Sequence, residues 1–246
     1  MPFTNEVERI YNQPAFILHK RPFRNTSLIL DLFTKDFGRI SLVAKGATGQ
    51  RSKLKGILQA FQPLHISWIR KTELGTVTSA ETLSPPFMLV DDSLYAAMYI
   101  NEIILKLTTK DDPHSEIFTK YLALLDQLKN KQNIEVNLRL FEKEMLQELG
   151  YELNLYQDAE THDDIDPDLT YEFVPGFGLV NNQMQQADKL LFSGRSICNF
   201  ANNIFETESD LKFAKIVMKL SLQQLLGKEE LKTRELFRSY LATKKH

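Results

Sequence analysis

The chain has 246 residues, of which 43% are hydrophobic and 25% charged, and its formal net charge is −2. This composition is ordinary for a globular protein with a packed core, and it argues against wholesale disorder. No apolar run reaches the roughly 18 residues of a membrane span, and the first residues lack a secretory signal. Because Cys198 is the single cysteine, an internal disulfide and a four-thiolate zinc site are excluded, and we expect a cytoplasmic protein.

The near-neutral net charge conceals an asymmetry along the chain. Residues 1–80 carry 12 Lys or Arg against 5 Asp or Glu, whereas residues 81–246 carry 18 against 27. A basic surface attracts phosphate and an acidic surface repels it, so the asymmetry favours two domains with different partners. Chance variation in charge between small domains is the alternative interpretation.

Short β-type runs separated by turn residues fill the first part of the chain. They comprise residues 15–19, 26–34, 39–45, 57–61, 64–70 and 75–82, with Pro63 suited only to an edge or the start of a strand. About five short strands without a helix-length segment predict a small barrel, such as an OB-fold, over residues 1–82. Such barrels bind single strands of nucleic acid through a basic groove and stacking aromatic rings.

Basic side chains gather in the expected loops of this barrel. The segment 45–56 (KGATGQRSKLKG) is rich in both Gly and Lys, so its backbone can approach phosphates while its ammonium groups neutralise them. Its spacing is not that of a P-loop, and a solvated surface loop is the alternative. The candidate DNA-binding residues are Lys20, Arg21, Arg24, Arg39, Lys45, Arg51, Lys53 and Lys55, and the candidate stacking rings are Phe23, Phe37, Phe61 and Trp68, for which core packing is the alternative.

From Pro85-Pro86 onward, helical periodicity replaces strand alternation. Helices are predicted at residues 94–107 after caps at 91–93, and at 115–128, 134–149, 193 onward, 210–226 and 233–241. The last helix is expected to dock through Leu236, Phe237 and Tyr240. The fold class is therefore predicted as α+β, with an OB-fold barrel over residues 1–82 and a mainly α-helical domain over residues 83–246.

An acidic stretch interrupts the helices. Residues 151–172 hold eight acidic side chains and no Lys or Arg, which indicates an exposed loop or extension, and the VPGFGLV segment 174–180 predicts a hairpin. His162 beside Asp163 and Asp164 could be drawn as a metal site, but a solvated acidic loop is the commoner outcome. No histidine or cysteine stands in a catalytic spacing, so we expect no metal or cofactor and no enzymatic activity.

Several segments, in order, resemble the RecO family of bacterial recombination mediators. They are AFILHKRPFRNTSLILDLFTKDFGRISLVAKGA (15–47), RSKLKGILQAFQPL (51–64), SAETL (79–83), LYAAMYINEIILKL (94–107), LRLFEKEMLQELGYELNL (138–155) and LKTRELFRSYL (231–241). The resemblance implies an OB-fold followed by a helical domain. Some members bind zinc through paired cysteines after the ELGY-like segment; here the acidic stretch, about 151–180, lacks cysteine, so a zinc site should be absent.

The resemblance also implies a function and its partners. It implies that the protein binds single- and double-stranded DNA and anneals complementary strands. It also implies that the protein works with RecR to load RecA onto strands coated by single-strand-binding protein, and that it is associated with the nucleoid. The acidic tail of single-strand-binding protein would enter an apolar pocket of the helical domain, with Arg139 as candidate cation beside Tyr99, Leu138 and Phe141. Surface pairing of Arg139 with Glu135 or Glu142 is the alternative for that residue. Three other functions are a protein-interaction adaptor with incidental DNA binding, an RNA-binding protein and a nuclease using the acidic loop.

Overall fold

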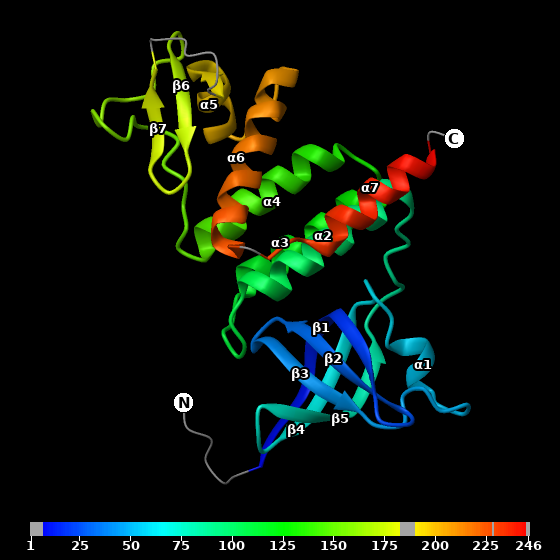
Figure 1. Ribbon diagram of the computed structural model, residues 1–246. Helices are drawn as coiled ribbons and strands as arrows, with labels where there is room; N and C mark the ends of the chain where they lie inside the picture. The colour runs from blue at the N-terminus through cyan, green and yellow to red at the C-terminus, as the bar shows by residue number, and fades with distance from the viewer. Residues whose placement is uncertain (1–6, 183–189, 228, 245–246) are drawn as a thin grey trace. The chain divides into compact units, whose positions relative to one another are not determined.

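The computed structural model describes residues 7–182, 190–227 and 229–244 (Figure 1). They divide into two compact units, of which the first runs to Gln132 and resumes at Leu231, while the second spans residues 133–230. The second unit is therefore an insertion in the sequence of the first. In the described part of the chain, no helix is both long and apolar enough to cross a bilayer.

The first unit begins with a closed barrel of five strands. These are β1 (Glu8–Phe23), β2 (Ser27–Thr34), β3 (Gly38–Ala44), β4 (Leu64–Arg70) and β5 (Leu74–Thr82), in the order β1-β2-β3-β5-β4, with β4 paired back onto β1. Neighbours are antiparallel except β3 and β5, which run parallel. A five-stranded barrel of this kind is an OB-fold, so the predicted fold class is confirmed.

Alternation of side chains along the strands builds the barrel interior. Ile40, Leu42 and Ala44 of β3 point inward, as their spacing predicts, and meet Leu30 and Leu32 of β2 in the core. Burial of these aliphatic side chains supplies the main driving force for closing the barrel.

Two predicted features of the barrel are wrong. Residues 57–61 form no strand; the chain instead makes a helical turn, α1 (Leu54–Ile57), and Leu58 and Phe61 are buried beyond it. The apolar run reflects burial against the barrel rather than strand pairing. Lys20 and Arg21 lie within β1 rather than in a loop, because this 16-residue strand pairs first with β4 and then with β2.

Two helices cover part of the barrel's outer face. In α3 (Ser115–Lys129), Phe118 packs against Phe16 of β1 and Phe33 of β2, while Asn101 of α2 (Asp91–Leu107) donates to the carbonyls of Ile17 and Leu18 on β1. Tyr121 packs edge-on against Phe16 at 5.1 Å, and its hydroxyl donates to Asn101 Oδ1 at 2.6 Å. Burial raises the pKa of Tyr121 far above its ordinary value, so the phenol stays a donor. This aromatic layer joins barrel and helices into one unit.

The last helix, α7 (Lys232–Lys244), returns to the first unit. Glu102 of α2 accepts hydrogen bonds from the backbone N–H groups of Lys232 and Thr233, which caps the start of α7. Phe237 and Tyr240 pack on Tyr95, as the sequence predicts. Leu236, which was also expected to dock, has an exposed side chain.

The second unit combines helices with a small sheet. It contains α4 (Ile134–Glu148), β6 (Thr170–Val174), β7 (Gly178–Asn181), β8 (Leu191–Ser193), α5 (Gly194–Ala201) and α6 (Glu208–Leu226), with sheet order β7-β6-β8. The hairpin predicted around residues 174–180 is confirmed as β6 and β7. Phe192, Phe200 and Phe213 form the aromatic centre of its core.

The predicted division near residue 82 coincides with the end of β5. The compact units divide elsewhere, after Gln132 and again before Leu231, because α2 packs on β1 of the barrel, and α3 and α7 pack on α2.

Candidate nucleic-acid interface

Two loops of the barrel lie together at one end. The backbone N–H of Thr48, in the glycine-rich loop after β3, donates to the carbonyl oxygen of Thr26, in the β1–β2 turn, at 3.0 Å. Lys20 Nζ, near the end of β1, donates to the Leu58 carbonyl at 2.9 Å, beyond α1. These bonds bring together segments that are more than twenty residues apart, and Figure 1 shows the glycine-rich loop and α1 at one end of the barrel.

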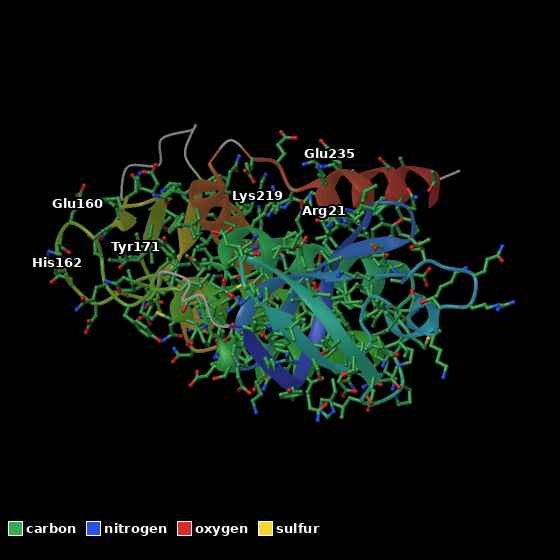
Figure 2. The ribbon with its side chains drawn as sticks, turned by 90° about the horizontal axis from the view of Figure 1, so that it is seen from below. Arg21, Glu160, His162, Tyr171, Lys219 and Glu235 are labelled. Atoms are coloured by element: carbon green, nitrogen blue, oxygen red, sulfur yellow. The ribbon has the colours of Figure 1, made fainter. Side chains whose placement is uncertain are left out.

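Most of the predicted DNA-binding cations stand exposed at this end. Exposed side chains are those of Arg21, Arg24, Lys45, Arg51, Lys53 and Lys55. Within the described ranges, none of these six side chains forms a hydrogen bond or an ion pair. The sequence between Asp36 and Glu73 contains seven basic residues and no acidic one. Side chains tipped with nitrogen project from the loop before α1 (Figure 2), so the end of the barrel presents uncompensated positive charge.

Two of the predicted cations have structural partners instead. The guanidinium of Arg39 donates twice to the carbonyl of Thr108, at 3.2 and 2.8 Å, just beyond α2. Burial lowers the pKa of Arg39, an effect opposed by the charges of Asp31 and Asp111. Lys20 is exposed, but its ammonium group holds α1 and the following turn against β1. Among the described residues, Arg39 and Lys20 therefore have structural side-chain hydrogen bonds that the other six predicted cations lack.

Most of the predicted stacking rings pack inside the first unit. Trp68 and Phe61 are buried in the first unit, and Phe37 packs edge-on against Trp68 at 5.3 Å. Phe23 is half-buried at the β1–β2 turn, with the guanidinium of Arg24 5.1 Å from its ring centroid. Sequence reasoning missed Tyr11, which is 65% exposed on β1. It missed Tyr11 because the first strand was expected to start only after Pro14.

The candidate pocket residues belong to different units. Tyr99 lies in the first unit, where its hydroxyl accepts from Arg234 Nη2 at 3.2 Å, whereas residues 138–141 lie in the second. Arg139 donates to Glu142 Oε1 at 2.7 Å, and this carboxylate is fully buried. Arg139 Nε is also buried, without a hydrogen-bond partner among the described residues. Leu138 is half-buried and Phe141 buried on the same helix, α4.

Comparison with known proteins assigns the family. The family model described as "Recombination protein O N terminal" matches residues 9–86, and that described as "Recombination protein O C terminal" matches residues 92–235. The chain belongs to the RecO family. It is 41% identical to "DNA repair protein RecO" of Coxiella burnetii (strain RSA 331 / Henzerling II) over 232 residues, covering 94% of this chain and 99% of that protein. It is 36% identical to the protein of the same name from Aliivibrio fischeri (strain MJ11), covering 92% and 94%.

The acidic stretch of this RecO chain is organised around one buried carboxylate. Asp158 accepts backbone hydrogen bonds from Glu160 at 2.8 Å, Thr161 at 3.1 Å and Asn181 at 2.6 Å. Burial raises the pKa of Asp158, but these hydrogen bonds outweigh burial and hold it below its ordinary value. Glu160 and His162 point outward from the loop (Figure 2).

The sequence offered a candidate metal site at His162, Asp163 and Asp164 and a single thiol, Cys198. The described residues contain no group of three or more His, Cys, Asp or Glu side chains placed to hold a metal ion. The Cys198 thiol lies 3.7 Å from the carbonyl oxygen of Ile165, and burial raises its pKa. A raised pKa lowers the thiolate fraction, which makes this cysteine a poor nucleophile.

Proposed function

We propose that this RecO-family chain is a DNA-binding recombination mediator. It anneals complementary single strands and, with RecR, helps to load RecA onto single-stranded DNA coated by single-strand-binding protein, in the cytoplasm at the nucleoid. The observation that carries the proposal is the pair of joined basic loops at one end of the barrel. The printed names of its relatives, DNA repair proteins, support it.

The mechanism follows from electrostatics. Exposed Lys and Arg side chains bind phosphates and release condensed counterions, which supplies affinity without reading sequence. Two strands bound to one basic surface repel each other less, so pairing becomes easier. Binding and annealing of this kind require neither a covalent intermediate nor nucleotide hydrolysis, and we propose that the protein is not an enzyme.

The distribution of charge between the compact units supports the same proposal. Residues 133–230 contain 8 Lys or Arg against 18 Asp or Glu, whereas the rest of the chain contains 22 against 14. The unit that contains the barrel is therefore basic, and the inserted unit is acidic. Phosphate is attracted to the first and repelled by the second.

The first test is fluorescence anisotropy of a labelled single strand at several salt concentrations. We expect tight binding at low salt, and in Arg51→Glu/Lys53→Glu we expect affinity to fall at least about tenfold. The logarithmic salt slope should shrink by roughly 0.7 for each phosphate that the variant no longer neutralises. Lys212→Glu/Lys219→Glu is the matched control, because these exposed lysines of α6 carry the same charge in the acidic unit.

Two results would contradict the assignment. If the double variant of the loop binds and anneals like the wild type, the basic loops are not the DNA site. If the wild type itself fails to bind at low salt, an adaptor that reaches DNA through protein partners becomes the better explanation. Competition between RNA and DNA strands of one sequence separates the RNA-binding alternative.

We also propose that Arg139, with Leu138 and Phe141 of the same helix, receives the acidic tail of single-strand-binding protein. A mostly buried guanidinium whose Nε lacks a hydrogen-bond partner among the described residues, on a helix with Leu138 and Phe141, suits a carboxylate accompanied by an aromatic ring. Removing Arg139 alone leaves the buried Glu142 without this partner, which should cost about 3 kcal/mol of stability. A loss of tail binding in Arg139→Ala would therefore be ambiguous.

The sharper variant is Arg139→Met/Glu142→Leu. Replacing a buried ion pair by apolar side chains of similar volume is often neutral for stability, so this variant removes the cation while keeping the fold. We expect it to unfold near the wild-type temperature and to lose binding of a synthetic acidic-aromatic tail peptide in calorimetry. Unchanged peptide affinity would remove Arg139 from the site, and unchanged DNA affinity serves as the internal control.

A further inference from the structure

Part of the barrel's outer surface presents an aromatic ring to solvent. Helix α3 packs on Phe16, from the middle of β1, and on Phe33, from β2. The start of β1, beside β4, instead carries Arg9 and Tyr11, whose side chains are exposed. Ile10 between them packs against the barrel core, so Arg9 and Tyr11 share the outward face.

A backbone irregularity lies directly beside Tyr11. The register between β1 and β4 shifts between Ile10 and Gln13, which marks a bulge, and Asn12 within it has a φ of 50°. Left-handed backbone is costly for a residue with a side chain, although Asn tolerates it better than most. Bulges of this kind re-aim a side chain and are frequent next to functional sites.

The bulge is held by a specific contact. The backbone N–H of Asn12 donates to the hydroxyl of Ser67 on β4 at 3.0 Å, and Ser67 is buried. The donor that a bulge would otherwise leave unpaired is therefore satisfied, and Tyr11 is carried on a defined backbone. A ring on a strand loses less freedom when it binds a ligand than a ring on a mobile loop.

The charge around Tyr11 suits an anionic partner. Arg9 lies two residues away on the same face, and the adjacent Glu8 is paired with Arg70 at 2.9 Å. The other basic residues of this part of the chain, Lys20, Arg21 and Arg24, lie toward the opposite end of β1. A flat ring exposed beside a guanidinium, on a basic barrel, offers one surface for a base and one charge for a phosphate.

We propose that Tyr11 stacks on a base of single-stranded DNA while Arg9 contacts a neighbouring phosphate. This second contact lies at the start of β1, whereas the basic loops lie near its end. It rests on the proposed function and adds selectivity, because a single strand exposes base faces that a duplex hides. The loops would then supply affinity for either form, and Tyr11 would favour the unpaired strand.

The test compares a thymidine oligonucleotide with an abasic strand of equal length. Stacking of a base on an aromatic side chain strengthens binding of a single strand, so Tyr11→Ala and Tyr11→Leu should each weaken binding of the thymidine strand roughly tenfold. Binding of the abasic strand and of duplex DNA should stay unchanged, as should the salt slope. Tyr11→Phe keeps the ring and should bind like the wild type. Tyr151→Ala, which removes an exposed tyrosine from the second unit, is the matched control.

The possible outcomes separate this inference from the proposed function. If Tyr11→Ala and Tyr11→Leu bind the thymidine strand normally while Arg51→Glu/Lys53→Glu binds it weakly, the basic loops stand and the stacking contact is wrong. An equal loss of affinity for the thymidine and abasic strands would also overturn stacking, because the abasic strand has no base that could stack on Tyr11. A wild type that binds no strand overturns both.

Discussion

Asp158 is the residue on which the acidic stretch of the second unit is built. Its side chain is buried, and both carboxylate oxygens accept backbone hydrogen bonds. Composition predicted an exposed acidic loop, and most of its carboxylates are exposed, but the sequence did not distinguish this one. It could not, because the donor from Asn181 comes from a segment more than twenty residues away.

The lowered pKa of Asp158 predicts a pH dependence of stability. A group whose pKa is lower in the folded state stabilises the fold above its unfolded pKa, which for Asp is about 3.9. That contribution is lost as pH falls through the folded value. Asp158→Asn should lower stability at pH 7 by about 2 kcal/mol, and the deficit should shrink below about pH 4.

Urea unfolding of the wild type and variant at pH 7 and at lower pH measures this prediction. Asp163→Asn is the matched control, because its side chain is exposed on the same loop. A deficit that is as large in acid as at pH 7 would show that Asp158 does not act through its charge.

At the scale of elements, α7 shows how local and distant signals combine. Helical spacing predicts residues 233–241 as a helix, and the structure extends it to Lys232–Lys244. The cap that begins it comes from Glu102, about 130 residues earlier in the chain, so no local signal could reveal it. At residues 57–61 the local signal is misleading. The apolar run predicts a strand, but the segment forms no strand and begins at the last residue of the helical turn α1.

Removing that cap predicts a local effect. In Glu102→Ala, the N–H groups of Lys232 and Thr233 lose their acceptor, and loss of an N-terminal cap costs about 1 kcal/mol. We expect faster amide hydrogen exchange in α7, with little change in the barrel strands. Glu81→Ala, at an exposed position of β5, is the control. Uniformly faster exchange throughout the first unit would show instead that α7 opens only with global unfolding.

At the scale of the whole molecule, the division of charge follows the compact units more closely than the division proposed from the sequence. The basic segment that contains α7 returns to the basic first unit, and the acidic residues concentrate in the insertion between Gln132 and Leu231. Charge counted along the chain changes sign near residue 80, because the sequence does not reveal that the last helix packs on α2 and so belongs to the first unit. We propose that the barrel of residues 1–82 carries the DNA contacts, within a larger unit that includes α2, α3 and α7.

The sequence by itself determined the barrel, the helices and the RecO family membership. Side-chain alternation, helical periodicity and turn residues are local properties, and the family segments are read in order along the chain. Only the tertiary structure decided which outward residues are available. Arg39 and Arg51 are alike in sequence terms, yet Arg39 binds the Thr108 carbonyl while Arg51 stays exposed. Trp68 is buried while Tyr11 is exposed. The physical reason is that the exposure of a side chain depends on which distant segments pack against its face of the strand. Side-chain alternation predicts the face on which a residue lies, but not which segment covers that face.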